Sequence, residues 1–494
     1  MAGKVLIANR GEIAMRIARA LRELSLPSVA IYTDADRGSL HVRHADEAVR
    51  VGEGRGDYLD AERIVATAQA VGAWGIHPGY GFLSESPELA GACQRAGLVF
   101  IGPPLSAIRE MGDKTRARQR MQDAGVPIVP GGPADTLEQA SQSAAGLGYP
   151  VLLKAAAGGG GKGMRRVNNA TELQRAWQRT RSEAEKSFGN GSVYIEKVIV
   201  GARHVEIQLL GDRHGNLVHL FERDCSLQRR HQKIVEETPC PVLLDETREA
   251  MCRVALAGAR AIGYYSAGTF EFLLAPDQSF HFLEMNTRLQ VEHPITELTT
   301  GVDLVQEMVR IADGAPLSVG SVTRRGVAIE ARIYAEDAAH GFLPAPGRIE
   351  YLAAPAGPFV RDDSGVSSGS QVSAEFDPLL SKLCAWGTTR AEALSRLRRA
   401  LGEYRVLGVT TNLDFLERLL AHPRVASGDY HTQFVEESPE LTGNPETSEH
   451  ALHDALLLAA LAAQADQRLA PQPTSETPSR WREAVRERAT RFRS

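Results

Sequence analysis

Residues 280–294, with the sequence FHFLEMNTRLQVEHP, contain the pattern around which the rest of the chain can be interpreted. If this stretch is extended, successive side chains point to opposite faces. One face then carries polar and charged groups: Glu284, Asn286, Arg288, Gln290 and Glu292. The other face can pack on a core and carries Leu283, Met285, Leu289 and Val291, with Thr287 among them. A solvated strand face is the alternative interpretation, but it more usually carries Lys, Thr and Ser, so the pattern favours a binding site.

A second stretch rich in β-forming residues, GTFEFLL at 268–274, precedes the first and is followed by a turn. A hairpin folded about residues 277–278 places Glu271 opposite Glu284. Two carboxylates and the amide oxygen of Asn286 then converge, and Mg²⁺ prefers such hard oxygen ligands, which it shares with substrate phosphates. Because two unpaired carboxylates repel each other, a bound cation would offset that cost.

Composition describes an ordinary globular protein of several domains. The chain has 494 residues, 43% of them hydrophobic and 24% charged, with a formal net charge of −5. This acidic balance gives no indication of nucleic-acid binding. The five cysteines form no C-x-x-C pair, and we find no signal peptide and no apolar run long enough to span a bilayer. We therefore expect a cytoplasmic protein without a membrane partner.

The N-terminal residues predict a β-α-β unit. Lys4–Ala8 is expected to form a buried strand, Glu12–Leu24 a helix and Ser28–Thr33 a second strand. The G-x-G-x-x-G pattern is missing, so a dinucleotide site is not indicated. The loop His77–Glu85 is dense in glycine and aromatic residues, and either a tight turn or close contact of the backbone with a ligand would explain it.

Four consecutive glycines follow a predicted strand that ends at Lys154, and Lys162 lies inside the same loop. Such a loop can wrap its N–H groups around phosphate oxygens. It is not a Walker loop, because Met164 stands where Ser or Thr would bind Mg²⁺. A flexible linker is the alternative interpretation. The two lysines favour a mobile cover over phosphate groups.

The following residues predict further strands and an anion site. Val193–Ile199 is a strand whose end can offer backbone hydrogen bonds to an adenine, and His204–Leu210 alternates as a half-buried strand. The unusually cationic stretch 222–233 lacks the aromatic residues expected of a nucleic-acid surface. A pocket for phosphate or bicarbonate is the favoured interpretation.

The C-terminal third predicts a strand at Val327–Tyr334, an amphipathic helix at Ala391–Tyr404 and another helix capped by Thr411. Beyond residue 440 the composition shifts to an Ala/Leu helix, a Pro-rich linker and a basic helix, for which a disordered tail and a partner-binding segment are equally good interpretations.

Taken together and in this order, these motifs make the chain resemble the biotin carboxylases, which are ATP-grasp subunits or domains of biotin-dependent carboxylases. The resemblance runs from Lys4 to about Glu437. It rests on Ile7–Ala14, His77–Glu85, Met111–Lys114, the glycine loop, Glu222–Lys233, Gly268–Phe272 and Glu284–Pro294. Two departures from the family pattern are Ala157 in the lid and Ala374 before Glu375-Phe376-Asp377.

The resemblance implies a mixed α/β fold in which an ATP-grasp domain follows a Rossmann-like pre-ATP-grasp domain. The expected divisions are an N-terminal domain (1–112), an ATP-grasp domain (113–325) with a glycine-rich lid (131–204), a C-terminal domain (326–445) and a helical or linker tail (446–494). The absence of an internal repeat argues against carbamoyl-phosphate synthetase.

The resemblance also implies a role for each matching residue. The metal set, for Mg²⁺ or Mn²⁺, is Glu271, Glu284 and Asn286. The residues that match the family's ATP-contacting positions are Lys114, Lys154, Glu196, His204, Gln228 and His231. The lid residues that match are Gly158, Gly159, Gly160, Gly161 and Gly163. Bicarbonate contacts match Arg288, Gln290 and Val291, with Lys233 nearby. The general base matches Glu292, and the arginine facing the biotin ureido oxygen matches Arg361.

The expected reaction begins with attack of bicarbonate on the γ-phosphate of ATP to give carboxyphosphate, in which positioning and charge neutralisation supply the catalysis. Carboxylation of biotin follows. We therefore predict the freestanding biotin carboxylase subunit, a homodimer, of an acetyl-CoA or other acyl-CoA carboxylase of fatty acid biosynthesis. No Met-Lys-Met occurs in the chain, so we expect biotin to be attached to a separate biotin carboxyl carrier protein. A carboxyltransferase subunit would be the second partner. The same subunit of a pyruvate, propionyl-CoA or methylcrotonyl-CoA carboxylase, another ATP-grasp ligase, and an inactive scaffold are the alternatives.

Overall fold

The structure, a computed structural model, describes residues 3–155, 164–442, 456–457 and 460. Residues Met1–Asn444 form one compact unit and Pro445–Ser494 form a second. The lid glycines 158–163 and nearly all of the tail 446–494, including its two predicted helices, therefore lie outside the described residues. None of the helices in the described ranges combines the length and the hydropathy that crossing a bilayer requires.

The N-terminal residues form a five-stranded parallel sheet in the order β3-β2-β1-β4-β5. Its strands are β1 (Lys4–Ile7), β2 (Ser28–Thr33), β3 (Glu47–Gly52), β4 (Ala73–His77) and β5 (Val99–Phe100). Its helices are α1 (Gly11–Glu23), α2 (Leu40–His44), α3 (Ala61–Ala70), α4 (Pro87–Arg95) and α5 (Leu105–Gly112). The predicted β-α-β opening is confirmed. Because β1 and β4 are parallel neighbours, the loops after them leave the same edge, and Asn9 Nδ2 donates to the carbonyls of Pro78 (2.7 Å) and Tyr80 (2.8 Å).

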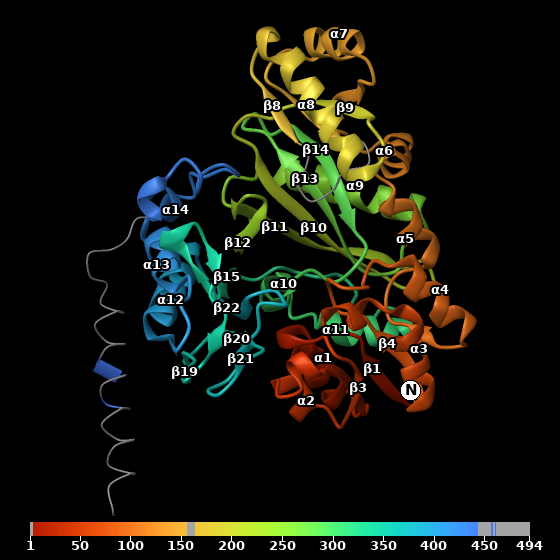
Figure 1. Ribbon diagram of the computed structural model, residues 1–494, viewed down its shortest axis with the longest axis vertical. Coiled ribbons are helices and arrows are strands. Elements are labelled where there is room, and N and C mark those ends of the chain that lie inside the picture. The colour runs from red at the N-terminus through yellow and green to blue at the C-terminus, as the bar shows by residue number, and fades with distance from the viewer. Residues whose placement is uncertain (1–2, 156–163, 443–455, 458–459, 461–494) are drawn as a thin grey trace, which may run out of the picture. The chain divides into compact units, whose positions relative to one another are not determined.

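An eight-stranded antiparallel sheet, in the order β14-β13-β10-β11-β12-β15-β22-β20, runs through the middle of the first unit (Figure 1). Its strands are β10 (Arg203–Gly211), β11 (Leu217–Arg229), β12 (Gln232–Thr238), β13 (Ser266–Leu274), β14 (Phe280–Asn286), β15 (Val327–Tyr334), β20 (Val360–Ser364) and β22 (Leu379–Gly387). Helices α9 (Asp245–Ala261), α10 (His293–Thr300) and α11 (Leu304–Ala312) accompany it. Strands from the ATP-grasp region and from the C-terminal region meet at the β12–β15 pair, where Glu236 lies opposite Glu330.

The residues predicted as a lid contain a smaller antiparallel sheet, β6-β9-β7-β8, next to α6 (Lys114–Asp123). Its elements are β6 (Gly131–Pro133), α7 (Leu137–Leu147), β7 (Val151–Ala155), β8 (Arg165–Val167), α8 (Ala170–Phe188) and β9 (Val193–Lys197). Figure 1 shows α7, α8, β8 and β9 at the end of the unit opposite the N-terminal sheet, beyond β13 and β14. Leu153, Trp177 and Ile195 belong to a core of its own, and Trp177 Nε1 donates to the Ala134 carbonyl at 2.7 Å.

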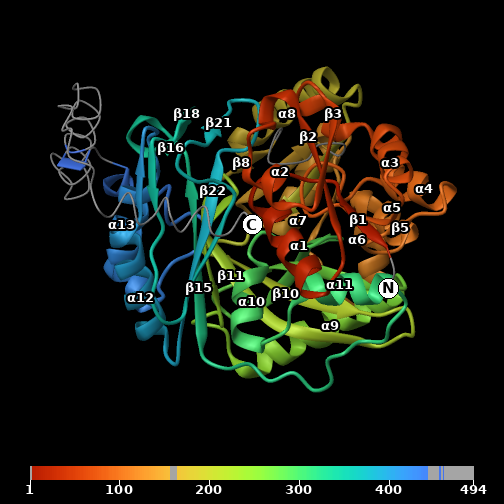
Figure 2. The ribbon, with the colours of Figure 1, turned by 90° about the horizontal axis from the view of Figure 1, so that it is seen from below.

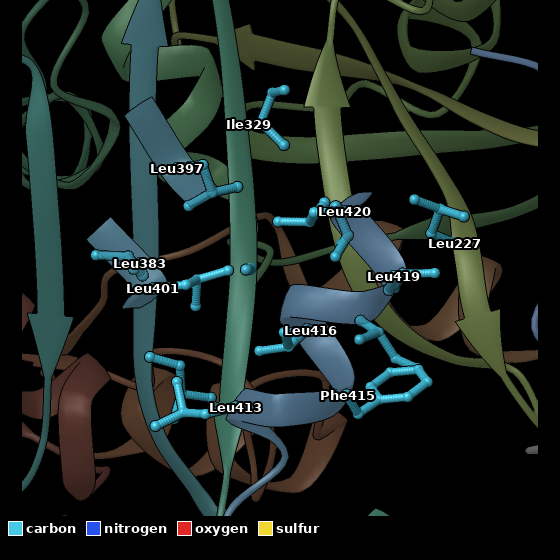
Figure 3. Close-up of a cluster of buried hydrophobic side chains, with 14 of the residues drawn as sticks. Leu227, Ile329, Leu383, Leu397, Leu401, Leu413, Phe415, Leu416, Leu419 and Leu420 are labelled. Atoms are coloured by element: carbon cyan, nitrogen blue, oxygen red, sulfur yellow. The ribbon is translucent and has the colours of Figure 1, made fainter. Parts of the chain in front are cut away.

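The C-terminal part of the first unit packs α12 (Arg390–Glu403) and α13 (Leu413–Ala421) against β15 and β22, while α10 lies against the opposite face of these strands (Figure 2). Figure 3 shows leucines of both helices gathered around Ile329 and Leu383. The remaining elements are α14 (Pro423–Ser427) and the short strands β16 (Glu336–Asp337), β17 (Leu343–Pro344), β18 (Gly347–Arg348), β19 (Tyr351–Ala353), β21 (Gln371–Val372) and β23 (Arg405–Leu407). The mixed α/β class predicted from the sequence is confirmed.

Two local predictions are wrong. The strand at 204–210 is buried on both faces rather than half-buried, because its apolar side chains pack in the core that includes α9 while Glu206 and Gln208 bond to Arg223 on the other face. The helix cap falls on Asn412 instead of Thr411.

Candidate functional site

A cavity of about 330 Å³ opens between α5 and α6, the lid strands β7 and β9, and β14. It is lined by five residues predicted to bind nucleotide or metal: Lys114, Lys154, Glu196, Glu284 and Asn286. Lys154 and Glu196 form an ion pair across the β7–β9 strands, and Arg118 Nη1 lies 3.4 Å from Glu196 Oε1. Lys114 begins α6, where the Asp113 side chain accepts two backbone N–H bonds. The volume is within the range of small-molecule sites, and cations reach it from two different elements.

The predicted pairing of Glu271 on β13 with Glu284 on β14 is confirmed. The predicted alternation is wrong in two places. Leu283 is the extra residue of a β-bulge, because Phe272 pairs with Phe282; Leu283 therefore lines the cavity and is 37% exposed instead of entering the core. The strand also ends at Asn286, and a loop rather than extended chain leads to α10.

That loop places Arg288 against Glu85, in the segment between β4 and α4. Glu85, which ends the glycine and aromatic loop, accepts the Thr287 N–H at 2.9 Å and Arg288 Nε at 3.0 Å through its two oxygens. Arg288 also donates to Gln290 Oε1 (3.1 Å) and Asn286 Oδ1 (3.0 Å). Three residues of the predicted polar face are thus joined by hydrogen bonds, even though the chain that carries them is not a continuous strand.

A buried cluster lies beside the metal set. Lys233 Nζ, on β12, contacts Glu206 Oε2 (2.7 Å), Glu271 Oε1 (2.9 Å) and Glu292 Oε1 (2.6 Å). His204 Nε2 lies 3.0 Å from Glu271 Oε2. One ammonium therefore bridges a predicted metal ligand and the predicted base.

The charges of this cluster set the protonation states of its members. Burial alone would raise the pKa of Glu292, but Lys233, Arg332 and Arg223 hold it well below its ordinary value. Glu271 behaves in the same way: burial opposes its charge, and Lys233 and His204 lower its pKa. Glu292 is therefore an ionised carboxylate around neutral pH, which is the form that a general base requires.

The pKa of Glu284 shifts in the opposite direction from those of Glu271 and Glu292. Burial and the charge of Glu271 raise the pKa of Glu284, and Lys114 only partly compensates for them. The carboxylates of Glu206, Glu271 and Glu292 already have Lys233, whereas Glu284 lacks a comparable cation among the described residues. A divalent cation held by Glu271, Glu284 and Asn286 would neutralise this excess charge, so the chemistry of the donor set fits Mg²⁺ or Mn²⁺. In the structure Asn286 Nδ2 donates to Glu271 Oε1 (2.8 Å) and Asn286 Oδ1 accepts from Arg288, so the amide would have to turn over to present its oxygen to the cation.

Sequence reasoning missed Arg332. This residue lies on β15, is buried, and points Nη2 at Glu292 Oε2 (3.0 Å) and Glu236 Oε1 (2.5 Å). Charged residues in the otherwise apolar stretch VAIEARIY at 327–334 were the available signal. Arg361, the residue predicted to face biotin, lies on β20 and donates to Glu297 Oε2 (2.7 Å) and Asp363 Oδ2 (2.7 Å).

The remaining described residues predicted to bind nucleotide lie outside the hydrogen-bonded cluster around Lys233. Gln228 is buried on β11 and pairs with Lys233 across the β11–β12 hairpin. His231 is exposed in the two-residue turn of that hairpin, where it and Arg230 have positive φ angles of 68° and 48°. The lid glycines lie outside the described residues.

Comparisons with known proteins agree with this geometry. The family model for the biotin carboxylase N-terminal domain matches residues 1–108, the model for the ATP binding domain of the carbamoyl-phosphate synthase L chain matches 113–319, and the model for the biotin carboxylase C-terminal domain matches 330–437. The chain is 48% identical to the biotin carboxylase of a Nostoc species, over 88% of this chain and 98% of that relative. It is also 48% identical to the methylcrotonoyl-CoA carboxylase subunit alpha of Arabidopsis thaliana, over 88% of this chain and 60% of the relative.

Solved structures give the same result. The biotin carboxylase domain of Hydrogenobacter thermophilus 2-oxoglutarate carboxylase, solved as a dimer with MgADP and bicarbonate, matches with a TM-score of 0.86 and 44% identity, over 90% of this chain and 99% of that one. A Campylobacter jejuni biotin carboxylase complex matches with a TM-score of 0.85 and 42% identity, over 88% and 98% of the two chains.

The fold and the site define a protein of the ATP-grasp class. The chain belongs to the biotin carboxylase family. It spans about three fifths of the length of the methylcrotonoyl-CoA carboxylase alpha subunits that it matches.

Proposed function

We propose that this chain carboxylates biotin on a carrier protein, with ATP and bicarbonate as co-substrates, by way of carboxyphosphate. The observation that carries the proposal is the bridge made by Lys233, whose ammonium contacts both Glu271 and Glu292. The residue proposed to bind the metal and the residue proposed to remove the bicarbonate proton therefore belong to one site. Bicarbonate still carries a proton when it attacks ATP, whereas the carboxylate substrate of another ATP-grasp ligase is already ionised and needs no base for that step.

The residues divide into three roles. Lys114, Lys154 and Glu196, in the cavity, are proposed to hold the nucleotide, with His204, Gln228, His231 and the lid glycines as further contacts. Glu271, Glu284 and Asn286 would hold Mg²⁺ or Mn²⁺, which neutralises phosphate charge when bound. Arg288 offers bicarbonate a planar fork, with Gln290 and Val291 beside it, and Glu292 takes the bicarbonate proton.

Carboxylation of biotin requires stabilisation of the charge that develops on its ureido oxygen. The family resemblance assigns this task to Arg361. The structure adds Arg332, whose contact with Glu292 puts it beside the proposed base. We propose Arg332 as the nearer candidate and retain Arg361 as the alternative.

The wider assembly is part of the proposal. We propose that the chain is the biotin carboxylase subunit of an acyl-CoA carboxylase, acts as a homodimer in the cytoplasm, and works with a carboxyltransferase. The names of the relatives, which include methylcrotonoyl-CoA and propionyl-CoA carboxylases, support the acyl-CoA class. A narrower proposal is that the acyl acceptor is acetyl-CoA, in which case the chain would take part in fatty acid biosynthesis. Purification of the tagged chain with its bound partners, followed by acyl-CoA carboxylation assays, tests each acceptor.

The direct test measures ADP release with and without bicarbonate and free biotin, together with transfer of labelled bicarbonate to biotin. We expect ATP cleavage to depend on bicarbonate and labelled carboxybiotin to accumulate. Glu292→Gln is the matched control, because it keeps the side-chain volume and removes the base. Bicarbonate-independent cleavage driven by an amine would identify another ATP-grasp ligase, and an absence of ATP cleavage would identify a scaffold.

A further inference from the structure

The backbone of residues 290–292 is held by two groups that lie outside the proposed substrate contacts. The Gln290 carbonyl accepts a hydrogen bond from His293 Nδ1 at 2.8 Å and a longer one from the His293 N–H at 3.4 Å. A carbonyl oxygen only accepts, so Nδ1 carries the proton. Because a trans peptide points its C=O and N–H in opposite directions, the Val291 N–H faces away from His293. No acceptor for this N–H is found in the part of the chain that the structure describes.

The next peptide group is fixed by a lysine that lies far away in the sequence. Lys382 Nζ, on β22, donates to the Val291 carbonyl at 2.9 Å. Lys382 is completely buried. Its ion-pair contacts are Glu12 Oε2 at 3.3 Å and Asp363 Oδ2 at 4.0 Å, and its ammonium lies 5.7 Å from the centre of the Tyr80 ring. The charges of Glu330 and Arg361 also act on this ammonium.

A completely buried lysine is costly for a fold, and an apolar side chain of similar length would often serve stability as well. Here the ammonium makes a hydrogen bond that no apolar side chain can make. Its acceptor is the carbonyl of the peptide group whose nitrogen belongs to Glu292. Three segments meet at this point: α1 through Glu12, β22 through Lys382, and the loop before α10 through Val291.

We propose that Lys382 is a positioning residue that orients the 290–292 backbone for bicarbonate through its hydrogen bond to the Val291 carbonyl. The inference rests on the proposed function, because it presumes that the Val291–Glu292 segment meets bicarbonate. Lys382 itself does not touch the substrate. It fixes the Val291–Glu292 peptide, while His293 fixes the peptide before it, so the anion meets a preformed N–H and carboxylate.

The test compares Lys382→Met, Glu12→Gln and the double variant in bicarbonate-dependent ATP cleavage. Met keeps the length of lysine without a donor. Glu12→Gln leaves the Lys382 donor in place, so it is the matched control. The double variant removes both buried charges and guards against loss of folding caused by an unpaired Glu12. Nucleotide affinity is measured separately by displacement of a fluorescent ATP analogue, and folding by thermal melting.

We expect Lys382→Met and the double variant to raise the KM for bicarbonate about tenfold, the equivalent of one charge-assisted hydrogen bond. Nucleotide affinity should stay within about twofold of wild type, and Glu12→Gln should keep the wild-type KM for bicarbonate. A folded Lys382→Met or double variant with the wild-type KM overturns the inference, as does equal weakening of nucleotide and bicarbonate. Wild-type protein without bicarbonate-dependent cleavage would instead overturn the proposed function.

Discussion

Replacing Arg332 and Arg361 one at a time should identify the residue that stabilises charge on biotin. The two arginines lie in different surroundings. Arg332 is buried and contacts the proposed base Glu292, whereas Arg361 is bound to Glu297 and Asp363. A partner for the ureido oxyanion must lie close to the base and the bicarbonate. The geometry therefore favours Arg332, while the family resemblance favours Arg361.

The expected loss follows from the chemistry of the second half-reaction. Removing one pre-organised charge partner from an oxyanion typically costs about 10²–10³ in rate. Arg332→Ser should therefore lower carboxybiotin formation by about that factor. Some bicarbonate-dependent ATP cleavage should remain, because carboxyphosphate can form and decompose without an acceptor. Lys233 stays beside Glu292 in this variant, so the base remains ionised.

Folding has to be controlled in this comparison, because Arg332→Ser leaves the buried carboxylates of Glu236 and Glu292 without a shared cation. Breaking a buried pair typically costs about 3–5 kcal/mol. Combining Arg332→Ser with Glu236→Gln removes one unpaired carboxylate and limits that cost. Thermal melting of the single and double variants shows whether a loss of activity follows a loss of fold.

The assay needs free biotin, ATP and labelled bicarbonate, with ADP release and label transfer measured in the same samples. Glu292→Gln should lose both activities together, since no base remains. If Arg361→Ser loses carboxybiotin formation while Arg332→Ser retains it, the argument from proximity is refuted and the assignment from the sequence stands. If the arginine variants and Glu292→Gln fail identically at ATP cleavage, the separation of roles is wrong.

Three further predictions concern the metal, the lid and a buried carboxyl. Glu284→Gln should reduce ATP turnover at least about a hundredfold with the fold intact, since it removes a ligand charge and little volume; wild-type turnover would refute the metal site. Residues 158–163 should gain protection from hydrogen exchange when ATP binds, and unchanged exchange would count against a lid. Burial raises the pKa of Glu12 from 4.5 to about 7, against the charge of Lys382, with Asp363 adding to the rise and Arg361 opposing it. The folded state then binds a proton that the unfolded state releases, so wild-type stability should fall by about 3 kcal/mol as pH rises from 4.5 to 7. For a unit of 444 residues this is about 3–4 °C in Tm, and the Tm difference between wild type and Glu12→Gln should change by that amount across the same pH range.

The sequence was sufficient for features that depend on local patterns. A turn placed at residues 277–278 predicted the Glu271–Glu284 pair correctly, but the register next to the turn differs by one residue, because Phe272 pairs with Phe282 and the bulge at Leu283 makes up the difference. The β-α-β opening followed from periodicity. The bulge at Leu283 could not be predicted in this way, because an extra residue in one strand cannot be recognised in a pattern whose alternation is already imperfect.

Features that depend on contacts between distant segments could not be predicted. Arg332 is separated from Glu292 by 40 residues in sequence, and only the pairing of β12 with β15 brings it to the cluster around Lys233. Glu206 lies on a strand whose alternation indicated a solvent face, yet that face is covered by Arg223 and Lys233. Alternation in the sequence shows which side chains are polar, but it does not show whether they face solvent or a buried polar network, since the same residue types occur in both.

The pairing of charges in the site also indicates how substrates would enter it. Lys154 is paired with Glu196, Arg288 with Glu85, and Lys233 with three carboxylates. An anionic substrate that binds one of these cations would therefore replace a carboxylate that is already paired with it. A metal ion at Glu271 would take up charge that Lys233 now balances and would leave that ammonium available to an anion. Metal binding and bicarbonate binding are then thermodynamically coupled through Glu271, so the KM for bicarbonate should fall as Mg²⁺ is raised, and a KM independent of Mg²⁺ would exclude this coupling.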